Sequence, residues 1–213
     1  MIALGLVLAL GVAASACTKK DDSGNANGST SQPSADTPPF DFSLGRVLGI
    51  SATPTQEKGI TPKSKPVAAD VATFMTALYK AQFLDPANWQ NGDYASAWAM
   101  YDGKAAAEAK QNADVLTLGT DAGSNYDTVT PSPEKQNLPV KVLLDAKNKP
   151  MQAVATVTFT VKAKGSDGTA TTIVSQGQYL LQASGGGWKV YGFTVTQNSG
   201  GNTTTKASSE ATP

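Results

Sequence analysis

From residue 140 onward, apolar and polar side chains alternate with the period of two that is typical of a half-buried β-strand. Residues 151–163 show the pattern best, with apolar side chains at every second position and mainly threonine or charged residues between them. Residues 169–183 and 188–197 continue it, and glycine-containing turns join the segments. A shorter candidate strand, residues 140–145, precedes them. The pattern predicts an antiparallel meander of long strands.

Two glycines inside these strands indicate that the sheet bends. Gly177 and Gly192 stand in mid-strand, where glycine commonly marks a bulge or a bend. At Gly192 the apolar side chains change from even to odd positions, which predicts that the buried face of the strand changes there. A strongly curved sheet that wraps around a helix would satisfy both observations.

The chain before residue 113 has helical spacing instead. Residues 66–84 form the first predicted helix, with Pro66 at its first position and Asp85-Pro86 ending it. Asp93 can cap a second helix, and residues 104–112 form a short third one. We therefore expect an α+β fold, with N-terminal helices packed in a strongly curved antiparallel sheet over residues 66–198.

The two ends of the chain are polar and low in complexity. Residues 17–65 are expected to form a disordered tether, because few large apolar side chains are available there to offset the loss of chain entropy. Residues 40–50 are an apolar exception that we interpret as an extended arm packed on the body. Residues 199–213 are rich in Gly, Ser and Thr and are predicted to be an unstructured tail.

The N-terminus has the pattern of an export signal. Residues 2–14 are apolar but too few to span a bilayer as a helix, and small residues follow them directly before Cys17. This arrangement resembles bacterial lipoprotein signals, in which a small-residue motif ends in a cysteine. The resemblance implies that residues 1–16 are removed by cleavage behind Ala16, and that Cys17 is acylated. The protein would then be held on the extracytoplasmic face of the cell membrane.

Two features depart from that signal. Ala14 stands where leucine is usual, and no Lys or Arg precedes the apolar run, which would be explained by a start upstream of Met1. The alternative is a plain secretory signal with Cys17 incidental. The tether that follows Cys17 favours the lipid anchor, because a spacer lets an anchored domain stand clear of headgroups and cell wall.

Composition excludes several kinds of chemistry. Acidic and basic side chains balance at 17 each, so no net positive field would attract nucleic acid. Histidine is absent from the sequence, which removes the commonest general base and metal ligand. With one cysteine, Cys17, an internal disulfide is impossible. We expect no cofactor, no metal site and no nucleic-acid partner.

Two short motifs carry a family resemblance. Residues 89–94 (WQNGDY), followed by Ala97-Trp98, and residues 187–190 (GWKV) resemble the nuclear transport factor 2-like fold, the cone shared with ketosteroid isomerase and polyketide cyclases. The resemblance covers residues 66–197 and extends to Mce-associated proteins, small secreted antigens and the N-terminal domain of some penicillin-binding proteins, all from the envelope of Gram-positive bacteria. It implies a cone-shaped domain and allows a homodimer through the sheet face.

Candidate catalytic acids lie near the joints between the predicted helices. Asp85 and Asp93 are better explained as helix caps than as proton carriers, and the inner strand faces carry no acid. We therefore expect a non-catalytic binding or accessory domain. The alternative is a small isomerase or cyclase that uses Asp93 or Asp102 with a pocket tyrosine. A purely structural spacer role is also compatible with the sequence.

Two surfaces are candidates for binding. One is an apolar pocket for a small lipid-like ligand, although its aromatic residues would equally fill a core. Its predicted lining residues are Trp89, Trp98, Tyr101, Phe159, Tyr179 and Trp188. The other is the polar row Thr156, Thr158 and Thr160 on the outer face of a strand, which could dock an envelope protein or simply be solvated.

Overall fold

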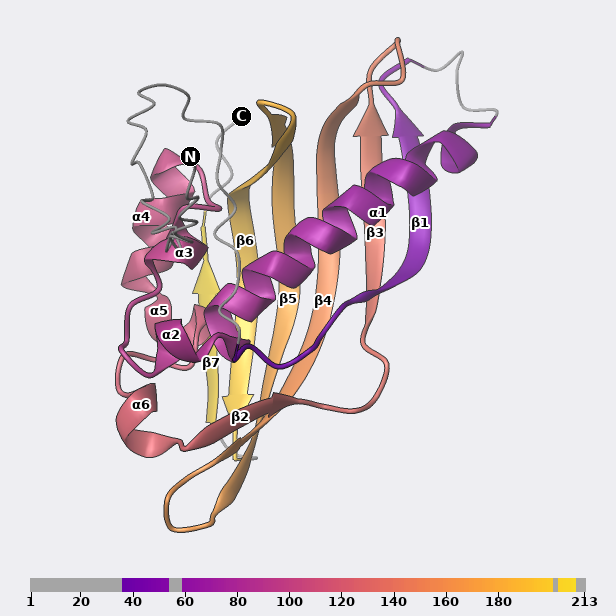
Figure 1. The fold of residues 1–213 in the computed structure, drawn as a ribbon. Helices are drawn as coiled ribbons and strands as arrows, with labels where there is room; N and C mark the ends of the chain where they lie inside the picture. The colour runs from indigo at the N-terminus through magenta and orange to yellow at the C-terminus, as the bar shows by residue number, and fades with distance from the viewer. Residues whose placement is uncertain (1–35, 54–58, 201–202, 210–213) are drawn as a thin grey trace, which may run out of the picture.

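The fold is a mixed α+β arrangement in which a curled, unclosed sheet of seven strands packs against a few helices (Figure 1). The computed structural model describes residues 36–53, 59–200 and 203–209. The order of strands across the sheet is β1-β3-β4-β5-β6-β7, and β2 pairs with β4 beside β3. The α+β class expected from the sequence is thus confirmed at this level of description.

The strands include the predicted meander. Strands β3 to β6 are consecutive antiparallel neighbours, whereas β1 pairs with β3 in parallel. The strands are β1 Ser43–Ser51, β2 Thr128–Pro131, β3 Asn137–Leu144, β4 Pro150–Lys164, β5 Ala170–Ser184, β6 Gly187–Ser199 and β7 Thr203–Ser208.

One long helix covers the inner face of the sheet, and the short helices gather beside β6 and β7 (Figure 1). The long helix α1 continues into a π-helical segment, η2, before the chain turns at Asp85. The helices are α1 Ile60–Tyr79, η2 Lys80–Leu84, α2 Pro86–Trp89, α3 Ala95–Trp98, α4 Gly103–Gln111, α5 Ala113–Leu116 and α6 Ala122–Asn125.

The first helix starts earlier than predicted. It begins at Ile60, after Gly59 in the left-handed conformation, so Pro66 lies inside the helix and not at its first position. The Ile60 side chain is buried, and the Ser64 hydroxyl donates a hydrogen bond to the Ile60 carbonyl.

The sheet also extends into both segments that the sequence analysis had placed outside the body. Strand β1 occupies most of residues 40–50 as a member of the sheet and not as an arm lying on it. Strand β7 falls within residues 199–213, which were expected to be unstructured, and pairs with β6. Its Ala207 side chain is buried, so one apolar position among polar residues is enough to fix the face of this strand.

The predicted change of face at Gly192 is confirmed as a β-bulge. The register shifts where Leu180 pairs with Gly192 and Leu181 pairs with Val190, which leaves Tyr191 as the extra residue. An extra residue bends its strand and increases the local twist. At Gly177 the pairing is regular, but the backbone of β6 approaches so closely that a Cβ atom there would lie 2.7 Å from the Cα atom of Val195.

Candidate functional site

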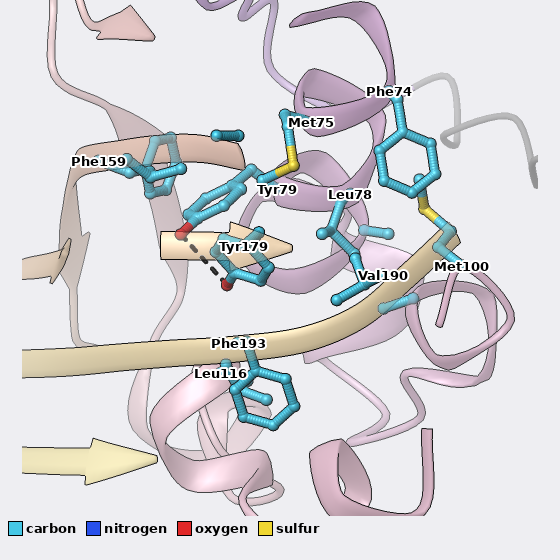
Figure 2. Close-up of a cluster of buried hydrophobic side chains, with 14 of the residues drawn as sticks. Phe74, Met75, Leu78, Tyr79, Met100, Leu116, Phe159, Tyr179, Val190 and Phe193 are labelled. Atoms are coloured by element: carbon cyan, nitrogen blue, oxygen red, sulfur yellow. Dashed lines mark hydrogen bonds between the residues drawn. The ribbon is translucent and has the colours of Figure 1, made fainter. Parts of the chain in front are cut away.

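The aromatic residues predicted to line a pocket are packed in the interior of the molecule. All are buried except Trp98, which is half-buried and packs against the core. Phe159 lies at the centre of one group, with its ring centroid 4.8 Å from that of Tyr79 and 5.4 Å from that of Phe83. In Figure 2, Phe159, Tyr79 and Tyr179 lie between α1 and the strands, packed against one another.

The structure brings only some of these residues together. Tyr179 joins the Phe159 group through Tyr79, with ring centroids 5.9 Å apart. Trp98 and Tyr101 form a second group, at 6.0 Å. Trp89 in α2 and Trp188 at the start of β6 are in neither ring group among the described residues. The predicted lining therefore divides between several parts of a filled core.

Tyrosine hydroxyl groups inside the core pair with one another and with nearby polar side chains. The Tyr79 hydroxyl donates a hydrogen bond to that of Tyr179 at 3.3 Å (Figure 2) and lies 3.2 Å from the Ser175 hydroxyl. The Gln82 side-chain amide donates one to the Tyr101 hydroxyl at 2.9 Å. Burial raises the pKa of Tyr79 to about 12, and it also raises the pKa values of Tyr101 and Tyr179 well above the ordinary value. These phenols stay neutral at physiological pH and serve as internal hydrogen-bonding groups.

The candidate aspartates lie at or just before the starts of helices. Asp85 is the N-cap of α2 and accepts a hydrogen bond from the backbone N–H of Ala87, as expected for a cap. Asp93 instead precedes Tyr94, the N-cap of α3, and accepts a hydrogen bond from the backbone N–H of Ala95. Asp102 does the same for the backbone N–H of Ala105 at the start of α4.

Glu108, in the middle of α4, differs from these aspartates. It is half-buried, and its Oε2 atom has no hydrogen-bond partner among the described residues. Glu108 is not one of the acids that the isomerase alternative requires, and that alternative, which uses Asp93 or Asp102 with a pocket tyrosine, stays a prediction.

A polar hollow of about 360 Å³ lies on the outer face of the sheet, opposite α1. It forms where the sheet pairing is interrupted. The β3–β4 ladder starts at the pair Val140–Ala155, and the β2–β4 ladder ends at Pro131–Val161, so residues 156–160 of β4 are in neither ladder. The hollow is lined by Ser132, Glu134, Lys135, Gln136, Asn137, Pro139, Thr156, Thr158 and Thr160.

Two residues account for this interruption. Pro139 stands where the ladder would continue opposite Thr156, and proline has no N–H to donate. Gln136 replaces part of the missing pairing with its side chain: its amide donates to the Thr160 carbonyl at 3.1 Å and accepts from the Thr160 N–H at 2.9 Å. The side-chain amide thus holds the edge of β4 in place while the neighbouring strand diverges.

Hydroxyl and amide groups continue across the outer face beyond the hollow. Thr158 pairs with Gln176, which pairs with Thr196 on the next strand, and Thr156 begins a second row of the same kind. Hydroxyl and primary amide groups both donate and accept hydrogen bonds. Every charged residue on the strands is basic: Arg46, Lys141, Lys162, Lys164, Lys189 and Lys206.

The sequence analysis identified the threonine row but missed the β2–β3 connection that completes the hollow. Residues 132–137 showed no clear periodicity, and nothing local links Gln136 to Thr160. The one usable signal was Pro139 at the start of a strand, because a proline there predicts an interrupted ladder.

The predicted lipid site is not part of the described structure. Ala16 and Cys17 lie outside the described residues. Among those that are described, no helix has both the length and the apolar content to cross a membrane, and no three His, Cys, Asp or Glu side chains are grouped so as to hold a metal ion. Comparison with family models, with curated proteins and with solved structures yields no match to this chain.

Proposed function

We propose that the chain is an extracytoplasmic lipoprotein, acylated on Cys17, whose folded body is a non-catalytic binding module of the nuclear transport factor 2-like cone type. The curled sheet around α1 is compatible with such a cone. The export-signal pattern before Cys17 supports the location, and the polar hollow on the outer face supports the binding role. The hollow is the observation on which the proposed activity depends.

The contrast between interior and exterior favours the outer face as the binding surface. The inner aromatic residues are already in contact with one another, so a ligand would have to displace packed rings to enter. The hollow, in contrast, presents the hydroxyls of Thr156, Thr158 and Thr160 beside one acid and one base, Glu134 and Lys135. Such a lining suits a polar envelope component that itself offers hydroxyl or amide groups.

A photo-crosslinking amino acid at Thr158, in the full chain expressed in its own envelope, tests this activity. We expect a specific crosslinked product, whereas the same amino acid at Asp70, on the exposed side of α1, should give none. The further change Thr156→Val should reduce the yield at Thr158 several-fold, because it removes one hydroxyl from the hollow with little change in side-chain volume.

The matched control is Thr73→Val on α1, which also removes one threonine hydroxyl but lies away from the outer face. The proposal would be contradicted if crosslinking at Thr158 and at Asp70 gave equal amounts of product. It would also be contradicted if Thr73→Val lowered the crosslinking yield at Thr158 as much as Thr156→Val does.

Incorporation of a palmitate analogue tests the anchor separately. The wild-type chain should be labelled and the Cys17→Ser variant should not, because Cys17 is the sole thiol in the sequence. Recovery of a free thiol at Cys17 in an uncleaved chain would contradict the lipoprotein part of the proposal while leaving the hollow untouched.

A further inference from the structure

One corner of the outer face is apolar and adjoins the hollow, because Val154 of this corner lies two residues before Thr156 on the same face of β4. Leu48 and Ile50 of β1 remain 39% and 45% exposed, and what makes them informative is that they adjoin further apolar side chains on the same face. Across the sheet, Leu48 is in register with Lys141, Val154 and Leu180, and Ile50 is in register with Leu143. We call this set the apolar corner: Leu48, Ile50, Leu143, Val154 and Leu180.

The apolar corner lies on an edge of the sheet. Strand β1 pairs with β3 and with no other described strand, so its second edge is unpaired (Figure 1). Exposed apolar side chains on an edge strand commonly mark an interaction surface.

Basic side chains surround the apolar corner. Lys141 lies within its rows, and Arg46 is exposed two residues before Leu48 on β1. The nearby β3–β4 turn adds basic residues, and Lys63 reaches it through a hydrogen bond to the Asn148 side chain. The basic residues of that turn are Lys147 and Lys149.

The acid in the same turn is Asp145. Its carboxylate accepts hydrogen bonds from the backbone N–H groups of both turn lysines, and both lysines are exposed. The charge around the apolar corner is therefore predominantly positive, which is complementary to an anionic surface.

We propose that the apolar corner docks on the anionic headgroup surface of the membrane to which Cys17 attaches the chain. This inference rests on the lipid anchor of the proposed function and adds an orientation to it. Aliphatic side chains that enter the headgroup boundary, surrounded by Lys and Arg, are the usual basis of interfacial binding. The body would stand on its β1 edge, with the threonine and glutamine rows of β4 to β6 farther from the lipid.

Tethering makes such a small surface sufficient. About 20 residues separate Cys17 from Asp36, so even a fully extended chain keeps the body within about 70 Å of the anchor. At that distance the second contact is intramolecular, and a weak surface affinity is enough to fix an orientation.

The lone cysteine permits a position-specific test. In the full chain carrying Cys17→Ser, whose retained apolar run 2–14 holds it at the vesicle in place of the lipid, an environment-sensitive fluorophore is attached to Leu48→Cys, with Ile50→Cys as the second reporter. The controls are Thr172→Cys on the outer face, eight residues along β5 from Leu180, and Asp70→Cys on α1, both exposed. With vesicles of equal parts phosphatidylcholine and phosphatidylglycerol, the emission should shift to the blue at both β1 positions and at neither control.

The apolar run 2–14 is common to all variants, so it cannot produce a difference between label positions. An equal emission shift at every label position would overturn the inference. So would the absence of an emission shift at both β1 positions in a chain that sediments with the vesicles. A β1-specific shift that grows with protein concentration without lipid would assign the corner to a second copy. Palmitate labelling of Cys17 is read independently, so failure of docking and failure of the anchor are distinguishable.

Substitution of single lysines in the Cys17→Ser chain provides a second test, measured as partitioning onto the same vesicles. Lys141→Gln should weaken vesicle partitioning about fivefold at low salt, because a basic side chain near an anionic surface contributes about that factor. Lys162→Gln, an exposed lysine near the opposite end of β4, should leave partitioning unchanged. Equal effects of the two substitutions would indicate non-specific attraction and contradict docking through the apolar corner.

Discussion

At Phe159 the sequence predicted the direction of the side chain but not what surrounds it. Its place in an alternating strand predicted an inward side chain, and the structure confirms a fully buried ring between Phe40, Tyr79 and Phe83. Whether that interior was open or filled could not be predicted, because filling depends on rings contributed by distant segments. Phe40, which touches Phe159, comes from a segment about 120 residues earlier.

Gly177 provides the sharpest prediction at the scale of the residue. A methyl group there would overlap the backbone of β6 at Thr194 and Val195, and a backbone cannot rotate away as a side chain can. Gly177→Ala should therefore lower the free energy of unfolding by about 2 kcal/mol. Urea unfolding measures the change.

Gly187→Ala is the matched control for this substitution. The nearest atom to a Cβ at Gly187 is 3.9 Å away, which is ordinary contact distance, so the change should be close to neutral. Equal stability of the two variants would mean that β5 and β6 are less closely apposed at Gly177 than the structure shows.

At the scale of helices and strands, the alternation of apolar and polar residues predicted the meander and its bulge. It could not identify which strands pair when they lie far apart along the chain. Strands β3 to β6 follow one another through short turns, so their pairing is local. The pairing of β1 with β3 joins segments about 90 residues apart, and no local pattern encodes it. The hollow depends on a similar distant relation, between Gln136 and the backbone of Thr160.

Strand β7 was missed for a different reason. Its threonines and serine resemble a polar tail, but threonine is also β-branched and favours an extended backbone. Ala207→Asp tests this strand, because the substitution places a charge at a buried position and should cost about 2 kcal/mol or more of unfolding free energy.

Ser208→Asp adds the same charge one residue later, where the side chain is exposed, and should have little effect on stability. If the two substitutions were equally harmless, the tail would lack the ordered strand that the structure places there.

For the whole molecule, the buried tyrosines predict a specific weakness at alkaline pH. A tyrosine in the unfolded chain ionises near pH 10, whereas burial raises the pKa of Tyr79 to about 12. Above pH 10 the unfolded state releases a proton that the folded state keeps, so the stability present below pH 10 is lost as the pH rises toward 12. The loss amounts to about 1.4 kcal/mol per pH unit from Tyr79 alone.

Burial also raises the pKa values of Tyr94, Tyr101 and Tyr179, which adds to the effect in the same direction. Phenolate absorbance and circular dichroism, recorded together through an alkaline titration, measure it. Ionisation of these tyrosines should coincide with loss of the native circular dichroism. Full phenolate absorbance near pH 10 in a chain that is still folded would contradict the buried hydroxyl cluster.

The parallel pairing of β1 also has a consequence for biosynthesis. Ribosomes make β1 early, but its partner β3 does not exist until about 90 further residues have been polymerised. Until then the edge that carries Leu48 and Ile50 has no native neighbour, and closing so long a loop is entropically slow. Incorporation of β1 therefore has to wait for the synthesis of β3, although β1 is the first strand along the chain.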